Sequence, residues 1–403
     1  MVFLSKRIYR MGDPIGETAG IVQKVEKKGI SVTKLIMGDP SRYFKLQENV
    51  AQAYKTAITQ SKTFYIEGPG LAALRSAVVD RYSDMYGIEF NSDKVIITQG
   101  VIEALQFLNR ALIYKNDKAI IVAPFFTQYV PCITSQEGKP LIAYYNESKD
   151  WNLDVESIEK TIKKEKIKPK YLLITTPNNP TGTVLSENSL KELVEFAKNN
   201  DIFIISDEVY DEIIYNGAKF TSIGKVAKGI PHMILNGASK NYVATGFRIG
   251  FSIIPEDDKK SDKLREVFIK LSYSRLSANT PSQYAILEGL KNKKAHERFI
   301  KSVLPKIERR SKLAAKLINE TGHLSAVVPN SAFYVFSKIN FDHLDLKNDK
   351  EFVEKLIEEE HVQLTRGSSF GTPGYVRLVS LPQEEVIVEA VKKIERFCKN
   401  HSK

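Results

Sequence analysis

The sequence predicts an α/β fold in which a mainly parallel central sheet is covered by helices and joined to a smaller α+β domain. Three features support this: short continuous apolar runs, helical periodicity between those runs, and a change of texture after about residue 290. Continuous apolar runs are typical of strands buried on both faces, as in a parallel sheet between helices. At 403 residues, the chain is also long enough for two or three domains.

Several apolar runs are the predicted strands of the central sheet. They lie at residues 95–98, 119–122, 171–174, 202–205 and 233–235, and residues 247–254 supply a further candidate. The segments between the runs carry apolar side chains at helical spacing, namely Val101, Leu105, Leu108 and Leu112, and again Leu190, Leu193, Val194 and Ala197. Strands that alternate with helices in this way predict a parallel sheet.

The change of texture after about residue 290 predicts a second, smaller domain. Residues 291–317 form a long, charged, helix-favouring stretch, residues 332–336 are a strand candidate, and residues 384–397 have the pattern of a closing amphipathic helix. We therefore assign residues 39–290 to a large domain, and residues 1–38 together with 291–403 to the small domain.

Composition and charge exclude several kinds of partner. The chain is 42% hydrophobic and 27% charged, which is ordinary for a globular protein, and its apolar runs are far shorter than the roughly 20 residues of a membrane helix. The formal charge of +11 suits either a solvated surface or a basic binding patch, but the lysines are spread out, and the densest group, at 163–170, is interrupted. We therefore expect neither a nucleic-acid partner nor a membrane partner.

The cysteine and histidine content gives two further expectations. Cys132 and Cys398 are too few for a disulfide framework and suit a reducing cytosol, and the first eleven residues lack the apolar core of a secretory signal. The six histidines are scattered without metal-ligand spacing. We expect a cytoplasmic protein with no metal site.

Residues with chemical potential follow successive predicted strands. Gly100, Phe126, Asn179, Asp207 and Lys240 each lie at or just past the carboxyl end of a predicted strand. In open α/β sheets that edge holds the ligand crevice. Any one of these residues could be a turn or cap residue. Their occurrence after five successive strands indicates a binding site.

The combination of a lysine, a carboxylate and an arginine suggests the chemistry of this site. Lys240 lies eight residues before Arg248, and Asp207 ends an apolar run. A lysine can bind the aldehyde of pyridoxal 5′-phosphate (PLP) covalently, a carboxylate can keep the ring nitrogen protonated, and an arginine can hold the phosphate. Together with Asn179 in the run 177–182, these residues predict a PLP site.

Further motifs extend over nearly the whole chain, from Gly38-Asp39-Pro40 to Arg377-Leu378-Val379-Ser380. Between these ends they are Tyr65 with Gly70-Leu71 and Leu74-Arg75, then Pro177 to Gly182, Ser206 to Tyr210, Ser239-Lys240, Gly246-Phe247-Arg248 and Phe370-Gly371. In this order they make the chain resemble the class I/II aminotransferases of PLP fold type I. Segments 275–281, 332–336 and 377–382 are most similar to the microbial alanine aminotransferase branch. The resemblance implies PLP as the cofactor and transamination as the activity.

For catalysis, the resemblance implies roles for Lys240, Asp207 and Tyr210. Lys240 holds the PLP aldehyde covalently and, once freed, carries the proton between the substrate Cα and the cofactor, which a lysine does best when its pKa is lowered. Asp207 pairs with the ring nitrogen and keeps it charged. Asn179 and Tyr210 hydrogen-bond the 3′ oxygen of the ring, although Tyr210 could instead be a packing aromatic residue.

The resemblance also implies contacts to the phosphate and to the ring face of PLP. Arg248 offers a planar fork for the phosphate, Ser239 offers a hydroxyl, and Val101 and Ile102 offer the backbone N–H groups of a helix start. Relatives often have small or hydroxylated residues at the last two positions, so only backbone contacts are expected there. Phe126 is expected to stack on the ring, although as bare sequence it could be a core residue.

Three residues are implied to reach the substrate or a neighbouring subunit. Arg377 grips the substrate α-carboxylate as a bidentate pair with Asn179 beside it, and Gly38 gives a backbone contact to the same end of the substrate. Arg377 could otherwise be a surface ion-pair residue. Tyr65 reaches the phosphate of the neighbouring subunit, so the active unit is expected to be a homodimer with shared active sites.

The predicted reaction moves an amino group from an L-amino acid, with alanine favoured, to 2-oxoglutarate by a ping-pong mechanism. Aspartate-type relatives often carry a basic residue near the position of Val101 and Ile102, and an apolar wall there disfavours an acidic donor. The alternatives are a broad-specificity, aromatic or aspartate aminotransferase, a PLP β-lyase or decarboxylase on the same scaffold, and a PLP-bound regulator.

Two arginines have open roles at this point. Arg275 either contacts the distal carboxylate of 2-oxoglutarate or belongs to a structural salt bridge. Arg366 stands before the loop 367–371, at a position where relatives often carry proline, so this loop departs from the family pattern.

Overall fold

The central feature of the structure is a seven-stranded sheet with the strand order β2-β8-β7-β6-β5-β3-β4. The computed structural model describes residues 16–403, so residues 1–15 of the predicted small domain lie outside the described residues. All neighbours from β7 to β4 pair in parallel, whereas β8 runs antiparallel to both β7 and β2. The prediction of a mainly parallel sheet is confirmed. The strands are β2 (Val95–Thr98), β3 (Lys118–Ala123), β4 (Lys139–Tyr144), β5 (Leu172–Thr175), β6 (Ile204–Asp207), β7 (His232–Gly237) and β8 (Gly250–Ile253).

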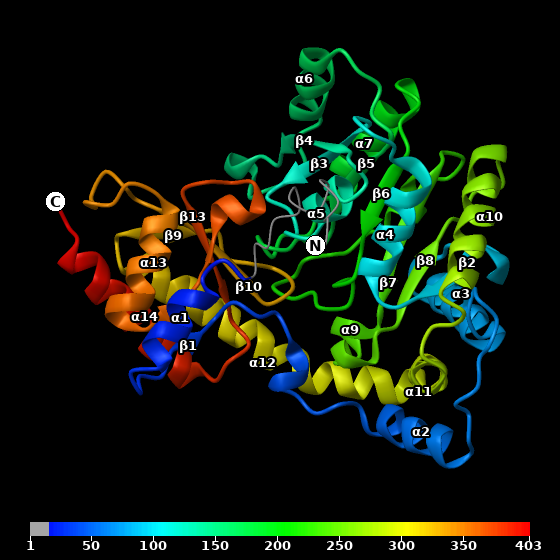
Figure 1. Cartoon of the computed structure of the whole chain (residues 1–403), viewed down its shortest axis with the longest axis horizontal. Coiled ribbons are helices and arrows are strands. Elements are labelled where there is room, and N and C mark those ends of the chain that lie inside the picture. The colour runs from blue at the N-terminus through cyan, green and yellow to red at the C-terminus, as the bar shows by residue number, and fades with distance from the viewer. Residues whose placement is uncertain (1–15) are drawn as a thin grey trace, which may run out of the picture.

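Both faces of this sheet are buried, as the continuous apolar runs predict. In β2, Val95 and Ile97 pack in one hydrophobic cluster on one face of the sheet. Ile96, which points to the opposite face, packs in a second cluster together with Ile205 of β6. The first cluster includes side chains of α3 (Ala72–Tyr86), α7 (Glu187–Asn199) and α11 (Thr280–Lys291). The second includes side chains of α4 (Val101–Leu112), α5 (Tyr129–Thr134) and α10 (Lys259–Ser274), and Figure 1 shows these helices around the sheet.

A smaller antiparallel sheet with the order β12-β13-β10-β9 lies beside the first one, and Figure 1 shows it in orange and red. Its strands are β9 (Leu324–Ala326), β10 (Tyr334–Ile339), β12 (Thr365–Arg366) and β13 (Tyr375–Val379). A separate core packs around it from α1 (Ala19–Glu26), α12 (Lys293–Glu320), α13 (Asp349–Glu360) and α14 (Glu384–Asn400). β1 (Thr33–Lys34) pairs in parallel with β11 (Val362–Gln363), which joins the N-terminal segment to this part of the molecule.

Short helical elements position the residues that follow the strands of the large sheet. α9 (Ala238–Asn241) begins immediately after β7, and the 3-10 helix η5 (Thr245–Phe247) precedes β8. The remaining elements are α2 (Glu48–Thr59), α6 (Val155–Glu165), α8 (Ile223–Val226), η2 (Pro40–Arg42), η3 (Ser92–Lys94), η4 (Glu147–Lys149) and η6 (Gly367–Phe370). In the described part of the chain, none of the helices is long and apolar enough to cross a membrane.

The structure corrects several predicted boundaries and adds one strand to the central sheet. The run 202–205 is a strand only from Ile204, and the candidate at 247–254 is a strand only over Gly250–Ile253 because the chain turns at η5 and Arg248 adopts a left-handed conformation. β4 was not predicted. It is the edge strand next to β3, it is only partly buried, and it contains Pro140, which cannot donate to a strand ladder and is tolerated mainly at edges.

Candidate functional site

A cavity of about 360 Å³ opens at the carboxyl ends of β3, β5, β6 and β7. Nearly all of the residues predicted for the site line it, although they are far apart in the sequence. They are Gly38, Val101, Ile102, Phe126, Asn179, Asp207, Tyr210, Ser239, Lys240, Arg248 and Arg377. The structure therefore brings the predicted residues that follow successive strands into one cavity, and Arg377 of the smaller sheet joins them.

Lys240 lies in α9, the short helix that begins as soon as β7 ends. Its Nζ donates a hydrogen bond to the carbonyl oxygen of Gly38 at 2.7 Å. Burial lowers the pKa of Lys240 to about 8; the negative charge of Asp39 opposes this shift, and the positive charge of Arg377 adds to it. The amine is therefore substantially neutral at mildly alkaline pH, as a nucleophile or a proton acceptor requires.

Asp207 is the last residue of β6, and its side chain is buried. The Tyr129 hydroxyl donates to Asp207 Oδ2 at 2.7 Å, and the Val209 amide donates to Oδ1 at 3.3 Å. Burial raises the pKa of Asp207 to about 6, although the hydrogen bond from Tyr129 opposes the shift. Both donors are neutral, and no cationic side chain of the described residues bonds directly to this buried carboxylate. A protonated ring nitrogen of PLP fits this environment.

Arg377 in β13 is a buried guanidinium that bonds to no carboxylate among residues 16–403. Its Nη1 donates to Asn179 Oδ1 at 2.8 Å, and its Nη2 donates to the Ile36 carbonyl oxygen at 2.5 Å. The guanidinium carbon lies 4.8 Å from the ring centroids of both Tyr334 and Phe370. Burial lowers the pKa of Arg377, and its Nε forms no hydrogen bond within the described part of the chain. The alternative of a surface ion-pair residue does not fit this burial, whereas a carboxylate ligand suits the position.

Arg248 lies against the amino-terminal end of α4. Its Nη1 donates to the Thr245 carbonyl oxygen at 2.8 Å, and its Nη2 donates to the Gln99 carbonyl oxygen at 3.4 Å. Gly100 caps α4 with a φ of 77°, and a Cβ there would lie 2.5 Å from Arg248 Nη2. The positive φ favours glycine, and a side chain at this position would displace the Arg248 guanidinium. A guanidinium beside a helix start is suited to a phosphate dianion, and Ser239 lines the same cavity.

Aromatic residues shape the rest of the cavity. The Phe126 ring lies at the cavity wall, with its centroid 5.6 Å from the Tyr129 ring in an edge-to-face arrangement. The hydroxyls of Tyr210 and Tyr334 share a hydrogen bond of 2.7 Å. A Cβ at Gly38 would collide with the Tyr334 hydroxyl, so only glycine fits beside this pair.

Several cavity residues were not found from the sequence. Tyr129 and Tyr334 carry hydroxyls that reach predicted site residues, and Asp39 accepts a hydrogen bond from Thr245 at 2.7 Å. Tyr129 is one helical turn after Phe126, which is a weak signal, and Tyr334 lies in a predicted strand with nothing to distinguish it from a core residue. Their roles depend on tertiary contacts that local sequence does not encode.

Two other predicted residues do not line the cavity. Arg275 Nε pairs with Glu103 Oε2 at 2.9 Å, and its Nη2 donates to the Ile97 carbonyl oxygen at 2.7 Å. This geometry matches the structural salt bridge and not the substrate contact. Tyr65 is 76% exposed and is adjacent in sequence to the exposed Phe64, so it does not reach the cavity of its own chain.

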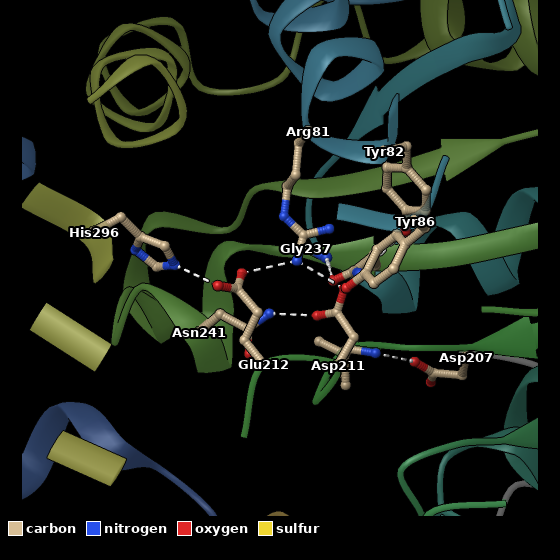
Figure 2. Close-up of polar contacts among 11 residues, drawn as sticks. Arg81, Tyr82, Tyr86, Asp207, Asp211, Glu212, Gly237, Asn241 and His296 are labelled. Atoms are coloured by element: carbon tan, nitrogen blue, oxygen red, sulfur yellow. Dashed lines mark hydrogen bonds and ion pairs between the residues drawn. The ribbon is translucent and has the colours of Figure 1, made fainter. Parts of the chain in front are cut away.

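A buried network of charges supports the segments that carry Asp207 and Lys240 (Figure 2). Arg81 of α3 pairs with Asp211 Oδ2 at 2.7 Å and with Glu212 Oε1 at 2.8 Å. Asn241, the residue after Lys240, donates to Asp211 Oδ1 at 2.6 Å. His296 Nε2 lies 2.8 Å from Glu212 Oε2. The network therefore fixes α9 and the loop after β6 to the same helix.

Part of the stability that this network provides depends on pH, because Arg81 lowers the pKa of Glu212. Burial raises the pKa of Glu212, but the positive charges of Arg81 and His296 outweigh burial and hold the pKa below its usual value. A carboxylate with a lowered folded-state pKa contributes stability that is complete above its ordinary pKa of about 4.3. That contribution is lost as the pH falls below this value.

Comparison with known proteins decides the family. The family model described as aminotransferase class I and II matches residues 31–394. The chain belongs to this family. It is therefore a PLP-dependent aminotransferase, an enzyme that acts on amino acids and 2-oxo acids, and the fold type I prediction is confirmed by solved aminotransferase structures.

Relatives of this aminotransferase carry names with different substrates. An aspartate aminotransferase of Thermotoga maritima is 32% identical over 98% of this chain and 99% of its own length. A glutamate-pyruvate aminotransferase, AlaA, of Haemophilus influenzae is 30% identical over 94% of this chain and 93% of its own. A solved alanine aminotransferase from Pyrococcus furiosus is 34% identical, covers 99% of this chain and 100% of its own, and has a TM-score of 0.93. The family is thus common to all three, and the substrate is not.

The buried network gives a prediction on stability. Arg81→Met leaves Asp211 and Glu212 buried together without their shared cation, and we expect a loss of about 3–5 kcal/mol in the free energy of unfolding. Arg309→Met is a matched control because it breaks a pair with Glu384 on a largely exposed arginine, and it should cost at most about 1 kcal/mol. Urea unfolding at neutral pH measures both losses. Equal losses in the two variants would contradict the role assigned to the network.

The lowered pKa of Lys240 gives a prediction on the cofactor-free enzyme. The neutral form of an amine reacts with acetic anhydride, so labelling of Lys240 should have its midpoint near the pKa of about 8. An ordinary lysine is half neutral only at about pH 10.4. Brief acetylation over a series of pH values, followed by peptide mass spectrometry, measures the midpoint. A Lys240 midpoint that coincides with that of surface lysines would refute the lowered pKa.

Proposed function

We propose that this aminotransferase moves an amino group from L-alanine to 2-oxoglutarate, giving pyruvate and L-glutamate by a ping-pong mechanism. The observation that carries the proposal is the buried, unneutralised Arg377, which lines the same cavity as the Lys240 amine. Both substrates have an α-carboxylate, so one guanidinium serves both half-reactions. Val101 and Ile102 add an apolar wall, which suits a short apolar side chain and disfavours a buried acidic one.

Different residues of the cavity are assigned to different parts of the cofactor PLP. Lys240 would hold the aldehyde, Asp207 the ring nitrogen, and Arg248 the phosphate, with help from Ser239 and from the backbone N–H groups of the α4 start. When bound, PLP supplies an electron sink that stabilises negative charge at the substrate Cα. Burial of Asp207 favours that role because a buried carboxylate gains most from a positively charged partner.

Proton transfer is assigned to Lys240. Its amine has a pKa of about 8, so near this pH both of its protonation states are populated and it can both take a proton from the substrate Cα and return it. Tyr210 and Asn179 are assigned to the 3′ oxygen of the ring, and Phe126 to its face. Each of these side chains already lines the cavity.

Substrate orientation is assigned to Arg377, Asn179 and Gly38. Asn179 accepts a hydrogen bond from Arg377, which fixes the direction of the guanidinium fork. The Gly38 carbonyl oxygen accepts from Lys240, and Gly38 is two residues after Ile36, whose carbonyl oxygen accepts from Arg377. A carboxylate held at this fork places the substrate Cα toward Lys240, and such positioning accounts for much of the rate enhancement in enzymes.

We also propose that the active unit is a cytoplasmic homodimer in which Tyr65 contributes to the cavity of the other subunit. Exposed large apolar side chains can mark association surfaces. Tyr65 and its neighbour in sequence Phe64 are exposed, and so is Tyr273, which lies beside Gly68. We further propose that residues 39–290 form the large domain, and residues 1–38 with 291–403 the small one. Most members of two hydrophobic clusters follow this division, although Phe336, Phe370 and Tyr375 pack in the cluster of the large domain.

A panel of amino donors tests the proposed substrate. With 2-oxoglutarate as acceptor, kcat/KM should be highest for L-alanine among alanine, aspartate and phenylalanine. Lys240→Ala should lower the rate by at least about a hundredfold, as expected for loss of a general base. Highest activity with aspartate or phenylalanine would replace alanine by that donor. Formation of pyruvate and ammonia without a 2-oxo acid would instead indicate a β-lyase.

A further inference from the structure

A second arginine lines the cavity, and unlike Arg377 it has a carboxylate partner. Arg366 Nη2 forms an ion pair with Glu17 Oε2, and Arg366 Nε donates to Ser369 Oγ at 3.3 Å. The Ser369 hydroxyl also donates to the Glu17 carboxylate at 3.4 Å. All three residues line the cavity.

The two arginines come from neighbouring strands of the small sheet. β12 and β13 are antiparallel, with Thr365 opposite Arg377 and Arg366 the next residue along β12. Arg377 Nη2 also donates to Thr365 Oγ1 at 3.4 Å. The register alone does not bring the two guanidinium groups together, because Arg366 is paired with Val376, but both arginines line the same cavity. That arrangement suits a substrate with two carboxylates.

Glu17 belongs to a different part of the chain from both arginines. It precedes α1, and the segment is attached by a hydrogen bond of 2.8 Å from Gln363 Nε2 to Thr18 Oγ1. The side chain of Glu17 is 36% exposed and that of Arg366 is 23% exposed. A partly exposed carboxylate keeps access to water, so its separation from Arg366 costs little. Glu17 can thus leave the arginine without the penalty of a fully buried charge.

A ping-pong aminotransferase with alanine and 2-oxoglutarate has to accept a methyl group and a distal carboxylate in one space. An arginine without an ion-pair partner would be unfavourable next to the methyl group, because its positive charge would be left uncompensated. An entirely apolar wall would reject the distal carboxylate. An arginine with a displaceable counter-ion meets both demands.

We propose that Arg366 binds the distal carboxylate of a five-carbon dicarboxylic substrate, and that Glu17 is the counter-ion which that carboxylate displaces. The proposal rests on the function proposed above. When the short donor is bound, Glu17 neutralises Arg366. When the dicarboxylate is bound, its distal group takes the place of the Glu17 carboxylate, and Glu17 is left in contact with water.

The two members of the pair should change selectivity in opposite directions. Arg366→Gln removes the distal site, so the ratio of kcat/KM for L-glutamate to that for L-alanine should fall by at least about tenfold. Glu17→Gln removes the competing carboxylate, so the same ratio should rise. Arg366→Lys keeps the charge without the fork and should give an intermediate ratio. Half-reactions of the holoenzyme with each amino acid, followed spectroscopically, measure the ratios.

A binding measurement separates recognition from chemistry. Titration calorimetry of the holoenzyme with glutarate, an unreactive dicarboxylate, should show at least about tenfold weaker binding in Arg366→Gln and tighter binding in Glu17→Gln. Butyrate, which lacks the second carboxylate, should not show this pattern. Arg309→Gln is the matched control, since its pair with Glu384 lies outside the cavity lining, and its ratios should equal those of the wild type.

The outcomes distinguish this proposal from the one on which it rests. If Arg366→Gln lowers both half-reactions equally, or leaves glutarate binding unchanged, the distal site is not at Arg366. If the wild-type enzyme reacts with neither alanine nor glutamate while glutarate binding still depends on Arg366, the proposed substrates are wrong and the dicarboxylate site stands.

Discussion

The separation of two ionisable groups from water at one edge of the sheet is the constraint on which the site depends. Asp207 ends β6 and Lys240 follows β7, and these strands are neighbours in a parallel pair. Burial shifts each pKa in the direction that disfavours charge. The carboxylate is thereby prepared for a cationic partner and the amine for a neutral, reactive state. The Arg81 network holds the two segments in place. Asp211, in the loop after Asp207, bonds both to Arg81 of α3 and to Asn241, the residue after Lys240.

The two arginines that line the cavity, Arg377 and Arg366, are held by different kinds of contact. Arg377 is held by an amide oxygen, a carbonyl oxygen and two aromatic rings, and these contacts restrict the position of its guanidinium. Arg366 is held by a carboxylate from another segment and by a serine hydroxyl. Rigid recognition suits the α-carboxylate that all the substrates share. A replaceable counter-ion suits the end at which the two substrates differ.

Much of the fold could be predicted because the central strands are buried on both faces, and this leaves continuous apolar runs in the sequence. The same logic fails for β4, an edge strand with Pro140 and partly exposed side chains. Residues at strand ends could be predicted for the site because parallel strands bring their carboxyl ends together. Tyr129, Arg81 and Glu17 could not, because each acts through a partner distant in the sequence. From the sequence alone, Arg366 is only a departure from the family pattern, because its proposed role depends on the tertiary ion pair with Glu17.

The most direct test of the account is to locate the attachment of the cofactor. Reduction of the holoenzyme with borohydride makes the bond between PLP and its lysine permanent, and peptide mass spectrometry then identifies the modified residue. The account predicts that Lys240 carries the cofactor in nearly all molecules, and that the same treatment of Lys240→Ala leaves no comparable modified lysine. Attachment to a different lysine in the wild-type enzyme would contradict the assignment of every other residue in the cavity.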